Sequence, residues 1–310
     1  MIPRPKPERF RLRRTMMFMN AQKPSLIKDA YIYGADTIML DLEDAVAENQ
    51  KDAARFSLYH ALTTIDYGDT EVLVRINGLD TPHWKEDIRV AVAGGADGIR
   101  ISKCESADDV KSVEKQILAA EREFGVEEGR TLIMAALESA KGVVNAYEIC
   151  CASDRMFGIA LAGGDFRKDM HVKVTDTGID IMVARGLILL AARAAGVQCF
   201  DTNFADFKNM EGFEREVRQN RKMGFDGKSI INPRQIPLVN ELFSPTKDDI
   251  TYAEHLIRSY AEQFARGVGV YTVDGKMVDI AFIKEARNTL KYAKKCGKYS
   301  GDLDQVGGEF

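Results

Sequence analysis

Two carboxylates in the middle of the chain could hold a hard metal ion. Glu138 directly follows the apolar run LIMAAL, and Asp165 follows the run MFGIALAGG. Mg²⁺ prefers carboxylate oxygens, and two such ligands leave positions for water and substrate oxygens. None of the four histidines is paired at metal-ligand spacing, which disfavours a zinc site or a histidine-dependent triad. We therefore predict a Mg²⁺ site formed by Glu138 and Asp165.

Other polar side chains also follow short apolar runs. They are Asp41, Glu43, Asp44, Arg75, Asn77, Lys103, Asp201 and Asn232. Arg75 could place a positive charge beside an anionic substrate, and Lys103 could act as a nucleophile. Each residue has a structural alternative: Arg75 or Lys103 could pair with Glu138, and Asp44 or Asp165 could cap the segment that follows it. Chemistry requires a scaffold that brings these residues to one place.

Eight short apolar segments, each followed by a helical pattern, predict such a scaffold. The expected strands are 15–20, 36–41, 71–77, 98–103, 131–139, 155–162, 198–203 and 227–231. Alternating strands and helices are typical of an α/β fold with a parallel sheet, and eight such units predict a (β/α)8 TIM barrel. In that fold the carboxyl ends of the strands form the active site. The polar residues above would meet there.

The chain continues beyond the eighth unit for longer than a barrel requires. Helices are expected over 248–266 and 279–295, and Asp274-Gly275 between them is a hairpin signal. A hairpin between two helices could serve as a lid or an oligomerisation arm. The expected organisation is a basic N-terminal arm (1–13), a barrel (14–245) and a C-terminal helix-hairpin-helix extension (246–310).

The composition excludes several classes of protein. The chain has 43 Lys and Arg against 47 Asp and Glu, without the basic excess that nucleic-acid binders usually carry. No uncharged apolar run approaches the roughly 18 residues that span a bilayer, so we expect a soluble protein. The five cysteines form no CxxC pair, which fits a reduced cytoplasm. Arg11, Arg13 and Arg14 are expected to form a solvated face, with phosphate contact as the alternative.

Five motifs, in the same order over nearly the whole chain, resemble a family of carbon–carbon lyases. This family includes the β subunit of citrate lyase and the malyl-CoA and citramalyl-CoA lyases. The motifs are LDLEDAV (40–46), VRINGLD (74–80), AALESAKG (135–142), GFDGKSIINPRQI (224–236) and DGKMVD (274–279). The resemblance implies a Mg²⁺-dependent barrel enzyme, usually oligomeric, whose C-terminal segment can close over a neighbouring subunit's site.

The resemblance also implies roles for individual residues. Glu138 and Asp165 match the metal ligands, and Arg75 matches the arginine that clamps the substrate. Asp279 matches a carboxylate that reaches the substrate, and only the resemblance nominates it. The full candidate set has the metal ligands Glu138 and Asp165, the catalytic residues Arg75, Asp279, Glu43 and Asp44, and the substrate-binding residues Arg75, Lys103 and Arg14.

The expected reaction is cleavage of a citryl thioester to oxaloacetate and an acetyl thioester, with Asp279 or water as the final proton donor. The thioester would be carried by an acyl carrier protein or CoA, and α and γ subunits of citrate lyase are candidate partners. The run INGLDTPHW leans toward a free-standing malyl-CoA or citramalyl-CoA lyase, which is the alternative. A non-catalytic, metabolite-binding paralogue is the second alternative. We also expect a homo-oligomer.

Overall fold

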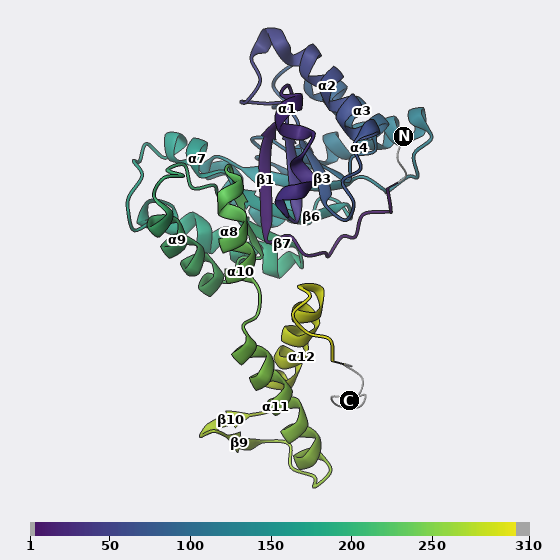
Figure 1. The fold of residues 1–310 in the computed structure, drawn as a ribbon. Helices are drawn as coiled ribbons and strands as arrows, with labels where there is room; N and C mark the ends of the chain where they lie inside the picture. The colour runs from purple at the N-terminus through teal and green to yellow at the C-terminus, as the bar shows by residue number, and fades with distance from the viewer. Residues whose placement is uncertain (1–3, 302–310) are drawn as a thin grey trace. The chain divides into compact units, whose positions relative to one another are not determined.

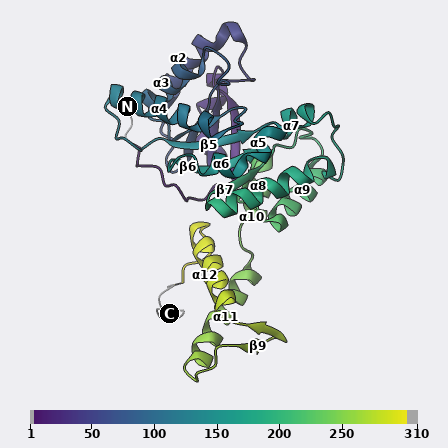
Figure 2. The ribbon, with the colours of Figure 1, turned by 180° about the vertical axis from the view of Figure 1, so that it is seen from behind.

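The computed structural model describes residues 4–301 of the chain. Eight parallel strands form a closed barrel in chain order, visible in Figure 1 and, from behind, in Figure 2. The strands are β1 (Thr15–Asn20), β2 (Thr37–Asp41), β3 (Glu71–Arg75), β4 (Gly98–Ile101), β5 (Leu132–Leu137), β6 (Met156–Leu161), β7 (Gln198–Asp201) and β8 (Gly227–Ile230). The predicted TIM barrel is confirmed, and each expected strand matches an observed one to within two residues at either end.

Helices connect successive strands and cover the barrel. They are α1 (Pro24–Ile27), α2 (Lys51–Thr64), α3 (Trp84–Gly94), α4 (Ala107–Phe124), α5 (Ala140–Val144), α6 (Ala146–Cys150), α7 (Gly163–Asp169), α8 (Met182–Ala195), α9 (Met210–Met223) and α10 (Ile236–Phe243), with 3₁₀ turns at Ala30–Tyr33, Glu48–Gln50, Ile179–Ile181 and Pro233–Gln235. Figures 1 and 2 show α2, α3 and α4 grouped on one side of the barrel and α8 and α9 on another.

The ends of α4 show how local sequence sets these helices. The Ser106 hydroxyl accepts a hydrogen bond from the Asp109 amide, and the Asp109 carboxylate accepts one from the Ser106 amide. This reciprocal capping satisfies amides that have no partner within the helix. Gly125 then ends the helix at a φ of 65°, in the left-handed region that glycine tolerates.

The barrel interior is apolar below its carboxyl end. One buried cluster contains Met16, Met39, Leu73, Leu132, Met134, Phe157, Ala160 and Phe200, which come from six strands and therefore meet inside the barrel. Side chains two residues apart on a strand point to the same face. Asp41 and Arg75, two residues beyond Met39 and Leu73, therefore stand above this apolar layer.

The expectation of a solvated arm is wrong for Arg13 and Arg14. Arg13 is 1% exposed and donates from Nε and Nη2 to the buried carboxylate of Glu71, at 2.8 and 2.7 Å. Arg14 pairs with Asp36, which lies just before β2. Both arginines precede β1 and sit at the amino ends of the strands, so they hold the arm to the barrel instead of facing solvent.

A second compact unit begins at Glu241, while the first extends to Asn240. It contains α11 (Lys247–Phe264), the hairpin strands β9 (Tyr271–Val273) and β10 (Lys276–Val278), and α12 (Ile280–Lys295). Its own buried core joins one face of α11, including Leu256, Ile257 and Tyr260, to Ile283 and Leu290 of α12. The helix-hairpin-helix order agrees with the pattern read from the sequence. Within residues 4–301, no helix is long and apolar enough to cross a membrane.

Candidate active site

A cavity of about 440 Å³ lies at the carboxyl ends of the barrel strands. Its polar lining comes from seven different strands or the turns that follow them. The lining includes Asn20, Asp41, Asp44, Arg75, Arg100, Asp165, Thr202 and Ser229. This is the end of the barrel where the sequence predicted that the polar residues would converge.

Strand register places four polar residues in one row across the barrel wall. Asn20 of β1 is aligned with Asp41 of β2, Asp41 with Arg75 of β3, and Arg75 with Arg100 of β4. The guanidinium of Arg75 donates from Nε and Nη2 to the two oxygens of Asp41, at 2.7 and 2.5 Å. This two-point contact fixes the plane of the guanidinium in a way that a lysine cannot reproduce.

Arg75 also faces the acidic loop that follows β2. Its Nη1 lies 2.8 Å from Glu43 Oε2 and 3.9 Å from Asp44 Oδ2. Burial alone would lower the pKa of Arg75, but the hydrogen bonds and charges of Asp41, Glu43 and Asp44 raise it above the ordinary arginine value. The side chain therefore carries a permanent positive charge within the cavity wall.

Glu43 is 5% exposed, and its carboxylate lies between two cations. Lys103 Nζ is 3.2 Å from Oε1, on the opposite side from Arg75. Each Glu43 oxygen lies within ion-pair distance of a cation, but neither accepts a hydrogen bond. Both oxygens can therefore still accept a hydrogen bond or a proton. Lys103 is half-exposed and has a left-handed backbone at a φ of 50°, a conformation uncommon for residues other than glycine.

Glu138 is the residue that directly follows β5. Its Oε1 accepts a hydrogen bond from the Lys103 amide at 3.1 Å, and its buried Oε2 has no partner. Burial and the nearby charge of Glu43 raise the pKa of Glu138 to about 7. The buried, unpartnered Oε2 is an acceptor without a role inside the chain.

Asp165 comes from the first turn of α7, after Gly163-Gly164. Burial would raise its pKa, but the Lys168 ammonium at 2.6 Å and the charge of Lys103 lower it. The turn is held from the next strand, because Thr202 Oγ1 accepts a hydrogen bond from the Gly163 amide at 2.9 Å. A Cβ on Gly163 would approach Thr202 to 3.0 Å, so glycine allows this close approach.

Glu138 and Asp165 fit a magnesium ion that has two protein ligands. Both lie close to Lys103: Glu138 accepts a hydrogen bond from the Lys103 amide, and the Lys103 charge lowers the pKa of Asp165. A divalent cation would compensate the charge of Glu138 that burial otherwise disfavours. No group of three or more His, Cys, Asp or Glu side chains among residues 4–301 could hold a metal ion. Water and substrate oxygens would therefore supply the remaining positions, as is common for Mg²⁺.

Arg100 was not predicted from the sequence, although it lies in the polar row. It is 2% exposed, lines the cavity, and its Nε and Nη1 have no hydrogen-bond partner. Burial and the neighbouring Arg75 lower the pKa of Arg100 to about 10. The sequence did contain a signal for Arg100, because the arginine lies within the short apolar strand GIRI. An arginine is rarely fully buried unless it is paired.

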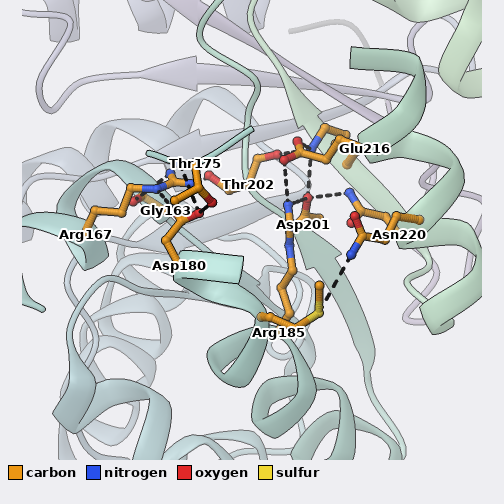
Figure 3. A network of polar contacts seen from close by, with 12 residues as sticks. Gly163, Arg167, Thr175, Asp180, Arg185, Asp201, Thr202, Glu216 and Asn220 are labelled. Carbon is orange, nitrogen blue, oxygen red and sulfur yellow. Dashed lines mark hydrogen bonds and ion pairs between the residues drawn. The ribbon is translucent and has the colours of Figure 1, made fainter. Parts of the chain in front are cut away.

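Two other candidates lie away from the cavity. Arg14 is held at the opposite end of the strands, where its Nε and amide both donate to Asp36. Asp201 was expected at the mouth, but its side chain turns out of the barrel toward α8 and α9. Figure 3 shows Arg185, Glu216 and Asn220 gathered around it. Its carboxylate also accepts from Lys228 Nζ at 2.8 Å, so Asp201 is the centre of a buried structural network.

Asp279 and Asn232 cap helical segments. The Asp279 carboxylate accepts a hydrogen bond from the Ala281 amide at 2.8 Å and begins α12. Asn232 caps the turn Pro233–Gln235 in the same manner. The Asp279 carboxylate is used in this cap, and a catalytic role for it stays a prediction.

The sequence matches known proteins over most of its length. Residues 14–233 match the HpcH/HpaI aldolase/citrate lyase family, and residues 174–297 match the C-C bond lyases of the TIM-barrel fold. Citrate lyase subunit beta of Leuconostoc mesenteroides subsp. cremoris is 50% identical over 91% of this chain and 94% of that protein. The Escherichia coli (strain K12) subunit is 41% identical over 93% and 95%. A (3S)-malyl-CoA thioesterase of Cereibacter sphaeroides (strain ATCC 17025 / ATH 2.4.3) is 36% identical over 91% and 94%.

Solved structures agree with these relationships. The crystal structure of CitE from Mycobacterium tuberculosis, in complex with magnesium, acetoacetate and coenzyme A, has a TM-score of 0.74 and 28% identity, covering 91% of this chain and 98% of that one. The citrate lyase beta subunit of the same organism, complexed with oxaloacetate and magnesium, has a TM-score of 0.61 and 30% identity, covering 74% and 96%. This chain therefore belongs to the HpcH/HpaI aldolase/citrate lyase family of carbon–carbon lyases.

Proposed function

We propose that this chain is a Mg²⁺-dependent carbon–carbon lyase that cleaves a citryl thioester to oxaloacetate and an acetyl thioester. The observation that carries the proposal is the cavity lined by Arg75 and Asp165, at the end of the barrel where Glu43 contacts Arg75 and Glu138 accepts a hydrogen bond from the Lys103 amide. The 50% identity to a citrate lyase subunit beta supports the choice of substrate.

Glu138 and Asp165 would hold the cation. When bound, Mg²⁺ supplies a Lewis acid that lowers the cost of removing the proton from the substrate hydroxyl. Glu43 is the candidate acceptor for that proton, because both of its oxygens are buried and lack oriented hydrogen bonds. Arg75 provides a fixed positive charge beside the forming keto acid, and its contact with Asp41 holds it in place.

Once the hydroxyl loses its proton, the bond between the hydroxyl-bearing carbon and the CH₂ group next to the thioester carbonyl breaks, and its electron pair passes to that CH₂ carbon, giving an enolate. That carbon must then receive a proton to form the acetyl thioester. Asp279 is the candidate donor and water is the alternative. Asp44 and Lys103 complete the acidic and basic lining around Glu43.

The carrier and the assembly are further parts of the proposal. A phosphopantetheine-bearing acyl carrier protein would present the thioester, together with α and γ subunits. We also propose a homo-oligomer, supported by an exposed apolar face on α8 and the adjoining α5 and α6. This face includes Val183 and Val144, each 76% exposed, and Leu190, which is 71% exposed.

Steady-state kinetics of the purified protein on citryl-CoA, malyl-CoA and citramalyl-CoA test the proposal. We expect the highest kcat/KM with citryl-CoA and loss of turnover in excess EDTA. A preference for malyl-CoA or citramalyl-CoA would favour the free-standing lyase. Absence of turnover on all three, with Mg²⁺ still bound, would favour the non-catalytic paralogue.

A further inference from the structure

The two arginines of the polar row differ in what they contact. All three nitrogens of the Arg75 guanidinium have a carboxylate partner within the chain. Nε and Nη2 donate to Asp41, and Nη1 lies within ion-pair distance of Glu43. Arg100 forms no ion pair within residues 4–301, and its Nε and Nη1 are buried without a hydrogen-bond partner. The cavity wall therefore contains one satisfied guanidinium and one that is free to bind.

Leaving a buried cation without a hydrogen-bonding partner is unfavourable, because the lost hydration is not replaced. Nearby carboxylates offset part of this cost through space: the charges of Glu138, Asp41 and Glu43 all act on Arg100. None of them is placed to accept a hydrogen bond from it. An anionic group of a ligand in the cavity would supply what the chain does not.

Arg100 is also held in a defined position. Its guanidinium carbon lies 5.1 Å from the centre of the Phe18 ring, and that of Arg75 lies 5.2 Å from the same ring. Stacking of a planar guanidinium on an aromatic ring favours a fixed orientation. Arg100 therefore presents its free donors without the freedom of a surface side chain.

We propose that Arg100 binds the second carboxylate of a substrate whose keto-acid half is a dicarboxylate, and so determines specificity for that class. This inference rests on the proposed lyase function of the same cavity. The first carboxylate would lie beside the hydroxyl at Glu138 and Asp165, and the second would pair with Arg100. A guanidinium and a carboxylate match in charge and in planar geometry.

Citryl and citramalyl thioesters form a matched pair of substrates for this question. They share the hydroxyl, the adjacent carboxylate and the thioester arm, and differ where a CH₂COO⁻ group replaces a methyl. A site built to bond a polar group discriminates strongly against an analogue that lacks it, because its own buried donor is then left unpaired. Arg100 would therefore favour citryl over citramalyl thioesters.

The test compares Arg100→Met and Arg100→Lys with wild type, using kcat/KM for citryl-CoA and citramalyl-CoA. We expect Arg100→Met to lower the citryl-to-citramalyl ratio about 100-fold, the size typical of losing a charged hydrogen bond, and Arg100→Lys to lower it less. Arg122→Met is the matched control, because Arg122 is an exposed arginine paired with Glu128 on the outside of the barrel. It removes the same charge and should leave the ratio unchanged.

A binding measurement separates this inference from the proposed function. Calorimetry with Mg²⁺ present would compare oxaloacetate with pyruvate, which lacks the second carboxylate. We expect wild type to prefer oxaloacetate and Arg100→Met to lose that preference, even if no thioester is cleaved. An equal fall for both thioesters, or an unchanged oxaloacetate preference in Arg100→Met, would overturn the inference and leave Arg100 as a charge-balancing residue.

Discussion

Arg13 and Arg100 are two buried arginines at opposite ends of the same barrel. They are 1% and 2% exposed, and each packs against a phenylalanine, Phe157 and Phe18 respectively. Arg13 precedes β1 at the amino ends of the strands and is paired at two points with Glu71. Arg100 faces the cavity at the carboxyl ends, where its Nε and Nη1 have no partner.

Burial by itself therefore does not separate a structural residue from a functional one. What differs is whether the chain supplies the partner. At the amino ends of the strands, the ion pairs Arg13–Glu71 and Arg14–Asp36 are complete within the protein. At the carboxyl ends, Arg100 and one oxygen of Glu138 are left over. Unused donors and acceptors at the same end of the barrel indicate a ligand that carries complementary groups.

The largest expected effect comes from removing either of the two carboxylates proposed to hold the cation. We expect Glu138→Gln and Asp165→Asn each to lower kcat/KM on citryl-CoA by roughly 10³-fold, because a lost cation would remove several kcal/mol of transition-state stabilisation. Thermal unfolding of the metal-free protein should change little, since Glu138 Oε2 bonds nothing in the chain.

Excess EDTA should have an effect on wild type similar to these substitutions. Full activity in EDTA would contradict the metal requirement. A large fall in the unfolding temperature of Glu138→Gln would instead indicate that this carboxylate is structural, and the contrast between the two barrel ends would fail at this residue.

A direct test of the contrast replaces both arginines with methionine and measures the free energy of unfolding with urea. Arg13→Met leaves the Glu71 carboxylate buried with Thr37 as its remaining side-chain partner, so we expect a loss of about 3–5 kcal/mol. Arg100→Met removes a buried charge that has no ion pair, so stability should be unchanged or increased. Equal destabilisation by both variants would show that Arg100 is as structural as Arg13.

Most of the fold was predictable because its signals are local. Each buried strand is a short apolar run, and glycines such as Gly125 mark where helices end. The C-terminal pattern was equally clear, because Asp274-Gly275 occupies the turn between β9 and β10. The burial of Arg13 was not predictable, because its partner Glu71 is distant in sequence and a basic N-terminal segment resembles a solvated arm.

Site residues were predictable where they lie at the carboxyl end of a strand and point into the barrel. Glu138, Asp165, Arg75, Glu43 and Lys103 come together as a group, as their positions suggested. Asp201 also ends a strand, yet alternation along β7 turns it outward because Phe200 points into the barrel. Arg100 was overlooked because it lies inside a strand, and only the register with Arg75 shows that it reaches the cavity.

A smaller effect is expected from Arg75→Lys. The substitution keeps the charge but loses one of the two hydrogen bonds to Asp41 and the planar contact with Phe18. We expect kcat/KM to fall about 100-fold, with a modest loss of stability. Near wild-type turnover would mean that Arg75 is a structural cation, comparable to Arg13 despite its place in the cavity wall.

The smallest expected effect on kcat/KM comes from replacing Asp279, whose carboxylate accepts a hydrogen bond from the Ala281 amide. Its carboxylate caps α12, so an alanine substitution would mix the loss of a cap with the loss of an acid. Asparagine caps a helix about as well as aspartate, and Asp279→Asn therefore isolates the acid. We expect unchanged thermal unfolding and a fall in kcat/KM of about tenfold, with water as the remaining proton source. Unchanged activity would mean that Asp279 only caps α12. Its role would then be structural, like that of the ion pairs at the amino ends of the strands.

Subunit mixing shows whether Asp279 acts on its own barrel. Truncation before Gly267 is a poor test, because it would expose the apolar face of α11 that packs against Ile283 and Leu290. Point variants avoid this problem. Asp279→Asn would be combined with Arg75→Ala under conditions that exchange subunits. If the C-terminal unit serves a neighbouring copy, hybrids contain some sites with both native residues and recover activity above the average of the two parents. Activity equal to that average, after exchange is verified by mass spectrometry, would mean that Asp279 acts within its own chain or not at all.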